Sequence, residues 1–190
     1  MNTLLEFPAL SIKFYIMKLF LSSIILFISL DWIYYSSKEG NFSVYLPEEP
    51  KISNQELESE IGLIKIYSYS AGEKIKKSED NYIINHTIYP QDFLLTLQDS
   101  TMDYIYETIL EGLLSQLKDS KLLYSQKEQI NGVDSRILLI KYDGDQSLKT
   151  ALIPFENNLY SLQLFSTMDQ RLSNHSDKFF NSFKLNFKTN

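Results

Sequence analysis

The chain has 190 residues, of which 44% are hydrophobic, 14% aromatic and 22% charged, so it can bury the core of one domain and is too apolar to be disordered throughout. It carries 18 basic and 24 acidic side chains, a formal net charge of −6. Nucleic-acid binding needs the opposite sign, because Lys and Arg release the counterions of the phosphate backbone. We therefore expect no nucleic-acid partner.

Residue types that carry catalysis or bind cofactors are scarce. The chain has no cysteine and two histidines, which excludes thiolate metal sites, a cysteine nucleophile and disulfides. Its six glycines lie ten or more positions apart, so no glycine-rich phosphate loop can form. We expect no catalytic residue, no cofactor and no metal site, and hence no enzyme. A hydrolase that uses a serine near His86 or His175 is the less favoured alternative.

The N-terminal segment bears on where the protein resides. Leu19 to Leu30 form an uncharged run of twelve residues that follows Lys13 and Lys18. This length suits the apolar region of a signal peptide better than a bilayer span, which needs about 20 apolar residues. We expect residues 1–31 to be an export signal or a membrane anchor, with Met17 as an alternative start, and a buried core helix as the competing interpretation. The run therefore predicts an exported protein.

A single domain is predicted from residue 32 to 187, and its first half consists of strands. Apolar and polar residues alternate over 41–46, over about 55–70 and over 82–89, as is typical of half-buried strands. On the last of these strands, one face carries Tyr82, Ile84, His86 and Ile88.

The main helix is predicted from Thr101 to Lys118, where apolar residues recur at helical spacing. Ser100 and Asp103 form a capping box at its start. The apolar stripe should pack on a sheet.

Four strands follow, predicted over 122–129, 133–142, 147–155 and 159–165. The dipeptides Asn131–Gly132, Asp143–Gly144 and Asn157–Asn158 predict tight turns and hence an antiparallel meander. Pro154 cannot donate to a ladder, so its end of the strand should be an edge or a bulge. A short amphipathic helix or turn over 177–185 closes an α+β domain.

Several segments, in this order, resemble the PsbP-like and Mog1-like domain family. Residues 35–50 contain Gly-Asn-Phe-Ser-Val-Tyr-Leu-Pro-Glu-Glu-Pro, which is similar to the strand that opens those domains. Residues 82–90, 131–136 and 158–162 resemble the family's later strands and hairpin, and residues 179–185 resemble its closing Phe-x-x-Ser-Phe-x-Leu. The likeness covers about residues 35–187.

The resemblance implies an α/β/α sandwich around an antiparallel sheet and a non-enzymatic role. Family members include lumenal subunits and assembly factors of photosystem II, a Ran-binding nuclear protein and bacterial envelope proteins related to DcrB. The export segment disfavours the nuclear branch, and together with the resemblance it implies a location in the thylakoid lumen or the periplasm. The expected function is therefore that of an exported accessory or assembly protein of a membrane complex, with photosystem II as the suspected partner. A DcrB-like envelope chaperone or binding protein is the alternative.

Two charged groups are candidate docking surfaces. They are an acidic stripe predicted on one strand face, Glu56, Glu58 and Glu60, and a basic loop, Lys74, Lys76 and Lys77. Each can also be an ordinary solvated surface. After residue 30 the chain has a net charge of −7, so the acidic stripe would suit a basic partner.

Overall fold

The computed structural model describes residues 32–72, 80–90, 93–94 and 99–186. The chain divides into two units, Met1–Asp31 and Trp32–Asn190. The predicted export signal or anchor lies outside the described residues. Within the described residues, no helix is both long enough and apolar enough to span a bilayer.

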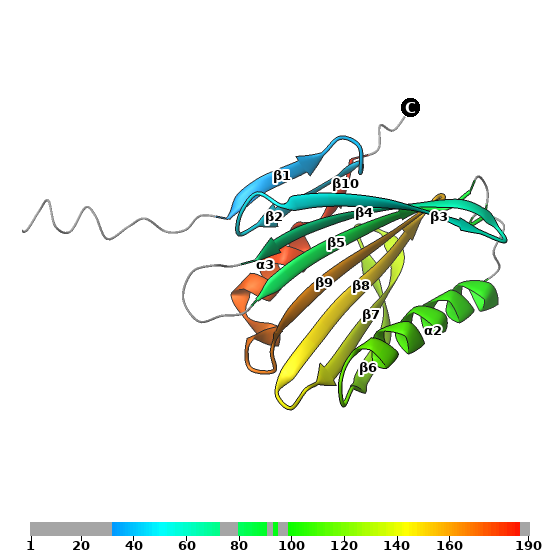
Figure 1. Ribbon diagram of the computed structural model, residues 1–190. Helices are drawn as coiled ribbons and strands as arrows, with labels where there is room; N and C mark the ends of the chain where they lie inside the picture. The colour runs from blue at the N-terminus through cyan, green and yellow to red at the C-terminus, as the bar shows by residue number, and fades with distance from the viewer. Residues whose placement is uncertain (1–31, 73–79, 91–92, 95–98, 187–190) are drawn as a thin grey trace, which may run out of the picture. The chain divides into compact units, whose positions relative to one another are not determined.

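A seven-stranded antiparallel sheet forms the centre of the domain, in the order β3-β4-β5-β9-β8-β7-β6 (Figure 1). Most neighbouring strands follow one another in sequence. The exception is β5, which pairs with β9 although the two strands are far apart in sequence. The strands are β3 (Lys51–Ser59), β4 (Gly62–Gly72), β5 (Asn81–Ile88), β6 (Lys121–Ile130), β7 (Val133–Tyr142), β8 (Gln146–Phe155) and β9 (Asn158–Thr167).

A second, small sheet has the order β1-β2-β10, with β1 at Ile33–Ser37, β2 at Phe42–Leu46 and β10 at Lys184–Leu185. The alternation in β2 predicted that strand, and its inward residues are buried. The sequence analysis missed β1. It also missed β10, because the closing segment was expected to be a helix or turn as far as residue 185. The helix α3 instead spans Asn174–Ser182, and the chain then extends to pair with β2.

Each face of the large sheet has its own core. The small sheet and α3 cover one face, where Phe179 packs on Tyr82 and Phe42 on Tyr69. The helix α2 (Asp99–Gln116) covers the other face, where Leu110 packs with Ile140, and Figure 1 shows it beside the β6–β8 half of the sheet. The domain is thus an antiparallel sheet structure with two helices. The expected α/β/α sandwich describes it only in outline, because the small sheet shares one face with α3.

The single strand predicted over residues 55–70 is wrong, because the chain turns at Glu60 and Ile61. Ser59 pairs with Gly62 across this turn, and β3 and β4 run back antiparallel. Gly62 has φ +113°, a conformation that favours glycine. The alternation of apolar and polar residues continues through the turn, so the pattern alone did not reveal it.

Two of the three predicted turns are confirmed. Asn131–Gly132 and Asp143–Gly144 all have positive φ, as tight hairpins require. The third is displaced by one residue, because Phe155 pairs with Asn158 and the turn consists of Glu156 and Asn157. Glu156 takes the positive φ of 52°.

Pro154 lies where the sequence placed an edge. It pairs with Leu159 of β9, but on the other side the ladder between β8 and β7 ends at Leu152 and Arg136. The missing N–H of proline therefore falls beyond that ladder, and β8 remains intact.

The helix α2 begins and ends two residues earlier than predicted, and its apolar stripe packs on the sheet as expected. The predicted N-cap at Ser100 is wrong, because α2 begins at Asp99 and Ser100 therefore lies within its first turn. In α3, the N-cap is Ser173, whose Oγ accepts a hydrogen bond from the Ser176 N–H. His175, which precedes the helix or turn predicted over 177–185, lies in the first turn of α3.

Candidate functional site

The acidic residues Glu56, Glu58 and Glu60 lie on the hairpin formed by β3 and β4. All three side chains are exposed. Glu56 and Glu58 alternate along β3 and so share one face, while Glu60 lies in the turn. We call these three residues the acidic arm.

The acidic arm occupies an edge of the large sheet. Every residue of β3 is exposed, and β3 pairs only with β4 in that sheet. Lys65 Nζ lies 3.2 Å from Glu56 Oε1. No ion pair of the described residues involves Glu58 or Glu60, so these two carboxylates keep their charge available to a partner.

The basic loop residues Lys74, Lys76 and Lys77 lie outside the described residues. Of the two docking groups predicted from the sequence, the acidic arm is therefore the one that the structure describes.

His86 lies on β5, and its buried side chain is between two tyrosines. Its side chain is 1% exposed, and its ring stacks on Tyr160 at 4.6 Å and lies 6.1 Å from the ring of Tyr67. Its Nε2 is 2.7 Å from Asn158 Oδ1. The amide Nδ2 of Asn158 donates to the carbonyl of Phe155, so Oδ1 faces the histidine and accepts a hydrogen bond from the Nε2–H.

Burial lowers the pKa of His86, and the hydrogen bond to Asn158 opposes this effect only in part. The ring is therefore neutral near pH 7. Its Nδ1 has no hydrogen-bond partner among the described residues. No serine hydroxyl bonds to either ring nitrogen within that set, so the arrangement that a serine hydrolase would need is not assembled at His86.

The second histidine, His175, is exposed on α3, and its ring lies 5.4 Å from the ring of Trp32. The two histidines thus belong to different elements and contact different aromatic residues.

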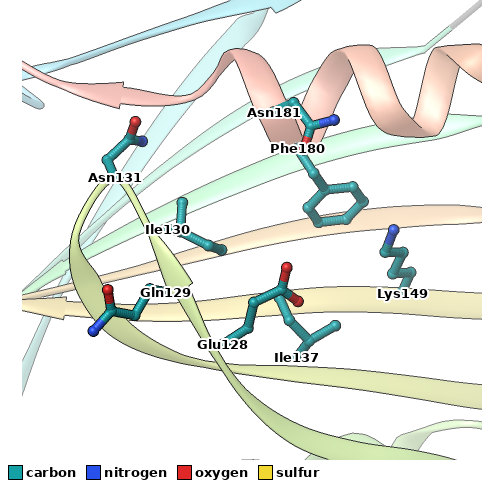
Figure 2. A pocket seen from close by; sticks show the side chains of 8 residues that line it. All are labelled: Glu128, Gln129, Ile130, Asn131, Ile137, Lys149, Phe180 and Asn181. Atoms are coloured by element: carbon teal, nitrogen blue, oxygen red, sulfur yellow. The ribbon is translucent and has the colours of Figure 1, made fainter.

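A hollow of about 180 Å³ lies between α3 and the strands β6–β8 (Figure 2). Lys149 of β8 reaches into it, and its Nζ is 4.6 Å from the ring centroid of Phe180. Burial lowers the pKa of Lys149, while Asp177 and Glu128 raise it to a lesser extent. The hollow is lined by Glu128, Gln129, Ile130, Asn131, Ile137, Lys149, Phe180 and Asn181.

The sequence analysis did not single out Lys149. A signal was present, because Lys149 is the charged residue in a strand whose same-face neighbours Ala151 and Ile153 are core residues. An ammonium group on a core face calls for a partner or a cavity, and here it has a cavity and an aromatic ring.

A larger hollow, of about 330 Å³, lies beside α2 and is also lined by β6, β7 and β8 residues. Arg136 hydrogen-bonds to Asp103, and Lys127 Nζ is 3.6 Å from the other oxygen of that carboxylate. The guanidinium of Arg136 also lies 5.2 Å from the ring centroid of Tyr106. Burial raises the pKa of Tyr106 to about 12, so its hydroxyl stays protonated. The two cations and the carboxylate tie α2 to the sheet.

Over the described part of the chain, no three His, Cys, Asp or Glu residues come together as metal ligands would. What the described surface offers is therefore a charged edge, a small lysine-lined hollow and a larger hollow beside an ion-pair cluster.

The fold resembles that of solved structures. The solution structure of cyanobacterial PsbP (CyanoP) from Synechocystis sp. PCC 6803 aligns with a TM-score of 0.53 at 11% identity, covering 82% of this chain and 93% of that one. PA94, a protein of unknown function from Pseudomonas aeruginosa, aligns with a TM-score of 0.37 at 14% identity, covering 77% of this chain and 90% of that one, which is too weak to carry an argument. No protein-family model and no curated protein matches the chain. The PsbP-like fold expected from the sequence is confirmed, and the likeness shows the fold alone.

Proposed function

We propose that this protein is an exported, non-catalytic accessory or assembly protein that docks on a membrane protein complex. If the source is an oxygenic phototroph, photosystem II is the complex we expect. The PsbP-like fold and the apolar N-terminal run support this proposal. The single observation that carries the docking step is the acidic arm on an exposed sheet edge.

The charge of the acidic arm determines what kind of surface it fits. Lys65 offsets part of the charge of Glu56, whereas Glu58 and Glu60 lie nearer the β3–β4 turn and outside that ion pair. Glutamates on an edge strand also discourage edge-to-edge pairing of sheets, so the arm has a structural use even without a partner. A basic surface on the complex would use the same charges for orientation and rate of association.

The basic loop is the competing contact surface. If Lys74, Lys76 and Lys77 make the contact, replacing all three by Glu weakens docking and changes its salt dependence. If the acidic arm makes it, this triple replacement leaves docking intact.

The test is a pull-down of the C-terminally tagged full chain from gently solubilised native membranes, with mass spectrometry of the proteins recovered. We expect subunits of one membrane complex to be enriched. The variant Glu58→Lys/Glu60→Lys should recover several-fold less of that complex. Its matched control is Glu107→Lys/Glu111→Lys, which makes the same charge change at exposed positions of α2.

A soluble pool of the protein with no partner would contradict the proposal and direct attention to the two hollows. Equal losses in the two double variants would contradict the role of the acidic arm, because net charge rather than position would then decide the binding.

A further inference from the structure

The small sheet exposes an aromatic pair on its outer face. Its inward residues are buried, and the outward residue Tyr34 is 60% exposed while Tyr45 is 39% exposed. The two residues are opposite each other in the register of β1 and β2, and their ring centroids are 5.6 Å apart. Single exposed aromatics are common on protein surfaces, but here two rings form one patch.

A lysine on α3 extends this patch and also lies over Trp32, which is 8% exposed and belongs to the domain core. Lys178 Nζ, on α3, lies 5.3 Å from the ring centroid of Trp32 and 5.3 Å from that of Tyr45. His175, one turn earlier on α3, lies against Trp32. We call the exposed residues Tyr34, Tyr45, His175 and Lys178 the aromatic face.

These residue types have a shared preference. Tyrosine combines an apolar ring with a polar hydroxyl and is enriched where a membrane meets water. Lysine near tyrosines can extend its ammonium group to lipid phosphates while its methylene groups stay in apolar surroundings. A set of this composition is typical of a surface at headgroup depth.

The position of the aromatic face along the chain gives a second, independent argument. The apolar run ends at Leu30, and Tyr34 is four residues later, a reach of about 14 Å for extended chain. If Leu19–Leu30 inserts in a bilayer, the first residues of the domain must lie near the headgroup zone, which is about 5–8 Å thick on each side. The outer face of the small sheet begins at that point of the chain.

We propose that the aromatic face rests in the headgroup zone of a phospholipid bilayer that holds the apolar run. This inference goes beyond the proposed function and rests on residues 1–31 acting as a membrane anchor, one of the two roles predicted for them. The domain after residue 30 has a net charge of −7, and the carboxylate of Asp177 adjoins Lys178 in sequence. The aromatic rings therefore make the contact, and anionic lipid adds little to it.

The absence of cysteine from the sequence allows single-site labels on the full chain. One variant, Ser36→Cys, places a polarity-sensitive dye on the exposed side of β1, in the same alternation as Tyr34. The control, Glu111→Cys, places it on α2, which covers the opposite face of the large sheet. Both are bound to phosphatidylcholine vesicles that carry a headgroup spin label as quencher, with and without phosphatidylglycerol.

We expect quenching several-fold greater at position 36 than at position 111, with little effect of phosphatidylglycerol. The variant Tyr34→Ser/Tyr45→Ser/Lys178→Ser should reduce quenching at position 36 to the control level while the chain still floats with the vesicles. Circular dichroism checks that each variant keeps its sheet signal.

Vesicle-bound chain with equal quenching at the two positions would overturn the aromatic-face contact and leave the anchoring in place. Chain that does not float with vesicles would overturn the contact together with the anchoring on which it rests.

Discussion

Strands β8 and β3 belong to the same sheet and have opposite surroundings. In β8 six of ten residues are buried, between α2 on one face and α3 on the other. In β3 all nine residues are exposed. The burial that stabilises the domain is therefore concentrated at the β8 side, and β3 contributes surface rather than core.

The largest expected effect contrasts one leucine from each strand. Leu152 of β8 is 0% exposed and Leu57 of β3 is 54% exposed. Truncating a buried leucine to alanine removes apolar contacts and leaves a cavity, at a cost of about 2–5 kcal/mol. Leu152→Ala should lower the free energy of unfolding by about 3 kcal/mol and Leu57→Ala by about 0.5 kcal/mol or less, as urea titration measures. Similar losses in both variants would show that β3 is packed against something in solution.

The next effect concerns the buried histidine near the centre of the sheet. Because burial lowers the pKa of His86 from 6.5, the unfolded chain takes up its proton at a higher pH than the folded chain does. The contribution of His86 to stability is complete above pH 6.5 and is lost as the pH falls toward the folded value, with a slope of up to about 1.4 kcal/mol per pH unit. His86→Phe removes this dependence and keeps a ring against Tyr160. Urea titrations between pH 7.5 and 5 should show the steeper loss in the wild type; parallel curves would refute the assignment.

The smallest expected effect on the free energy of unfolding is that of the ion pair at the β3 edge of the large sheet. Lys65 and Glu56 form an exposed ion pair, with 44% and 57% of their side chains accessible. Such pairs are screened by water and salt and contribute between about 0 and 1 kcal/mol. Glu56→Gln should therefore change the free energy of unfolding by about 0.3 kcal/mol, with Glu58→Gln as the control for removing a β3 carboxylate without a described ion pair. A loss above 1 kcal/mol for Glu56→Gln alone would mean that the arm is part of the folded core.

The same contrast explains which parts of the fold were predictable. The β6–β7–β8 region was correctly outlined, because Asn131–Gly132 and Asp143–Gly144 are local turn signals on either side of β7. The hairpin of β3 and β4 was not, since glutamates and apolar residues alternate straight through its turn. There Gly62 was the sole local sign.

The candidate functional residues also differ in whether the sequence alone could reveal them. The acidic residues were found because three glutamates at spacing two stand out in a sequence. Only Glu56 and Glu58 share a strand face, because β3 ends at Ser59 and Glu60 lies in the turn. Lys149 was overlooked because its burial depends on α3. This helix begins at Asn174, 25 residues further along the chain. The aromatic face combines β1, β2 and α3, so it emerges only when the chain is folded.

The central claim is that the exposed edge makes the docking contact while the core supports the fold. The most direct measurement is the dissociation constant of the full chain for the membrane complex recovered in the pull-down, at low and at high salt. For Glu58→Lys/Glu60→Lys we predict binding several-fold weaker than wild type at low salt, and a smaller difference at high salt, where exposed charges are screened. Glu107→Lys/Glu111→Lys should bind like wild type at both. Wild-type affinity for the arm variant at low salt would contradict the claim.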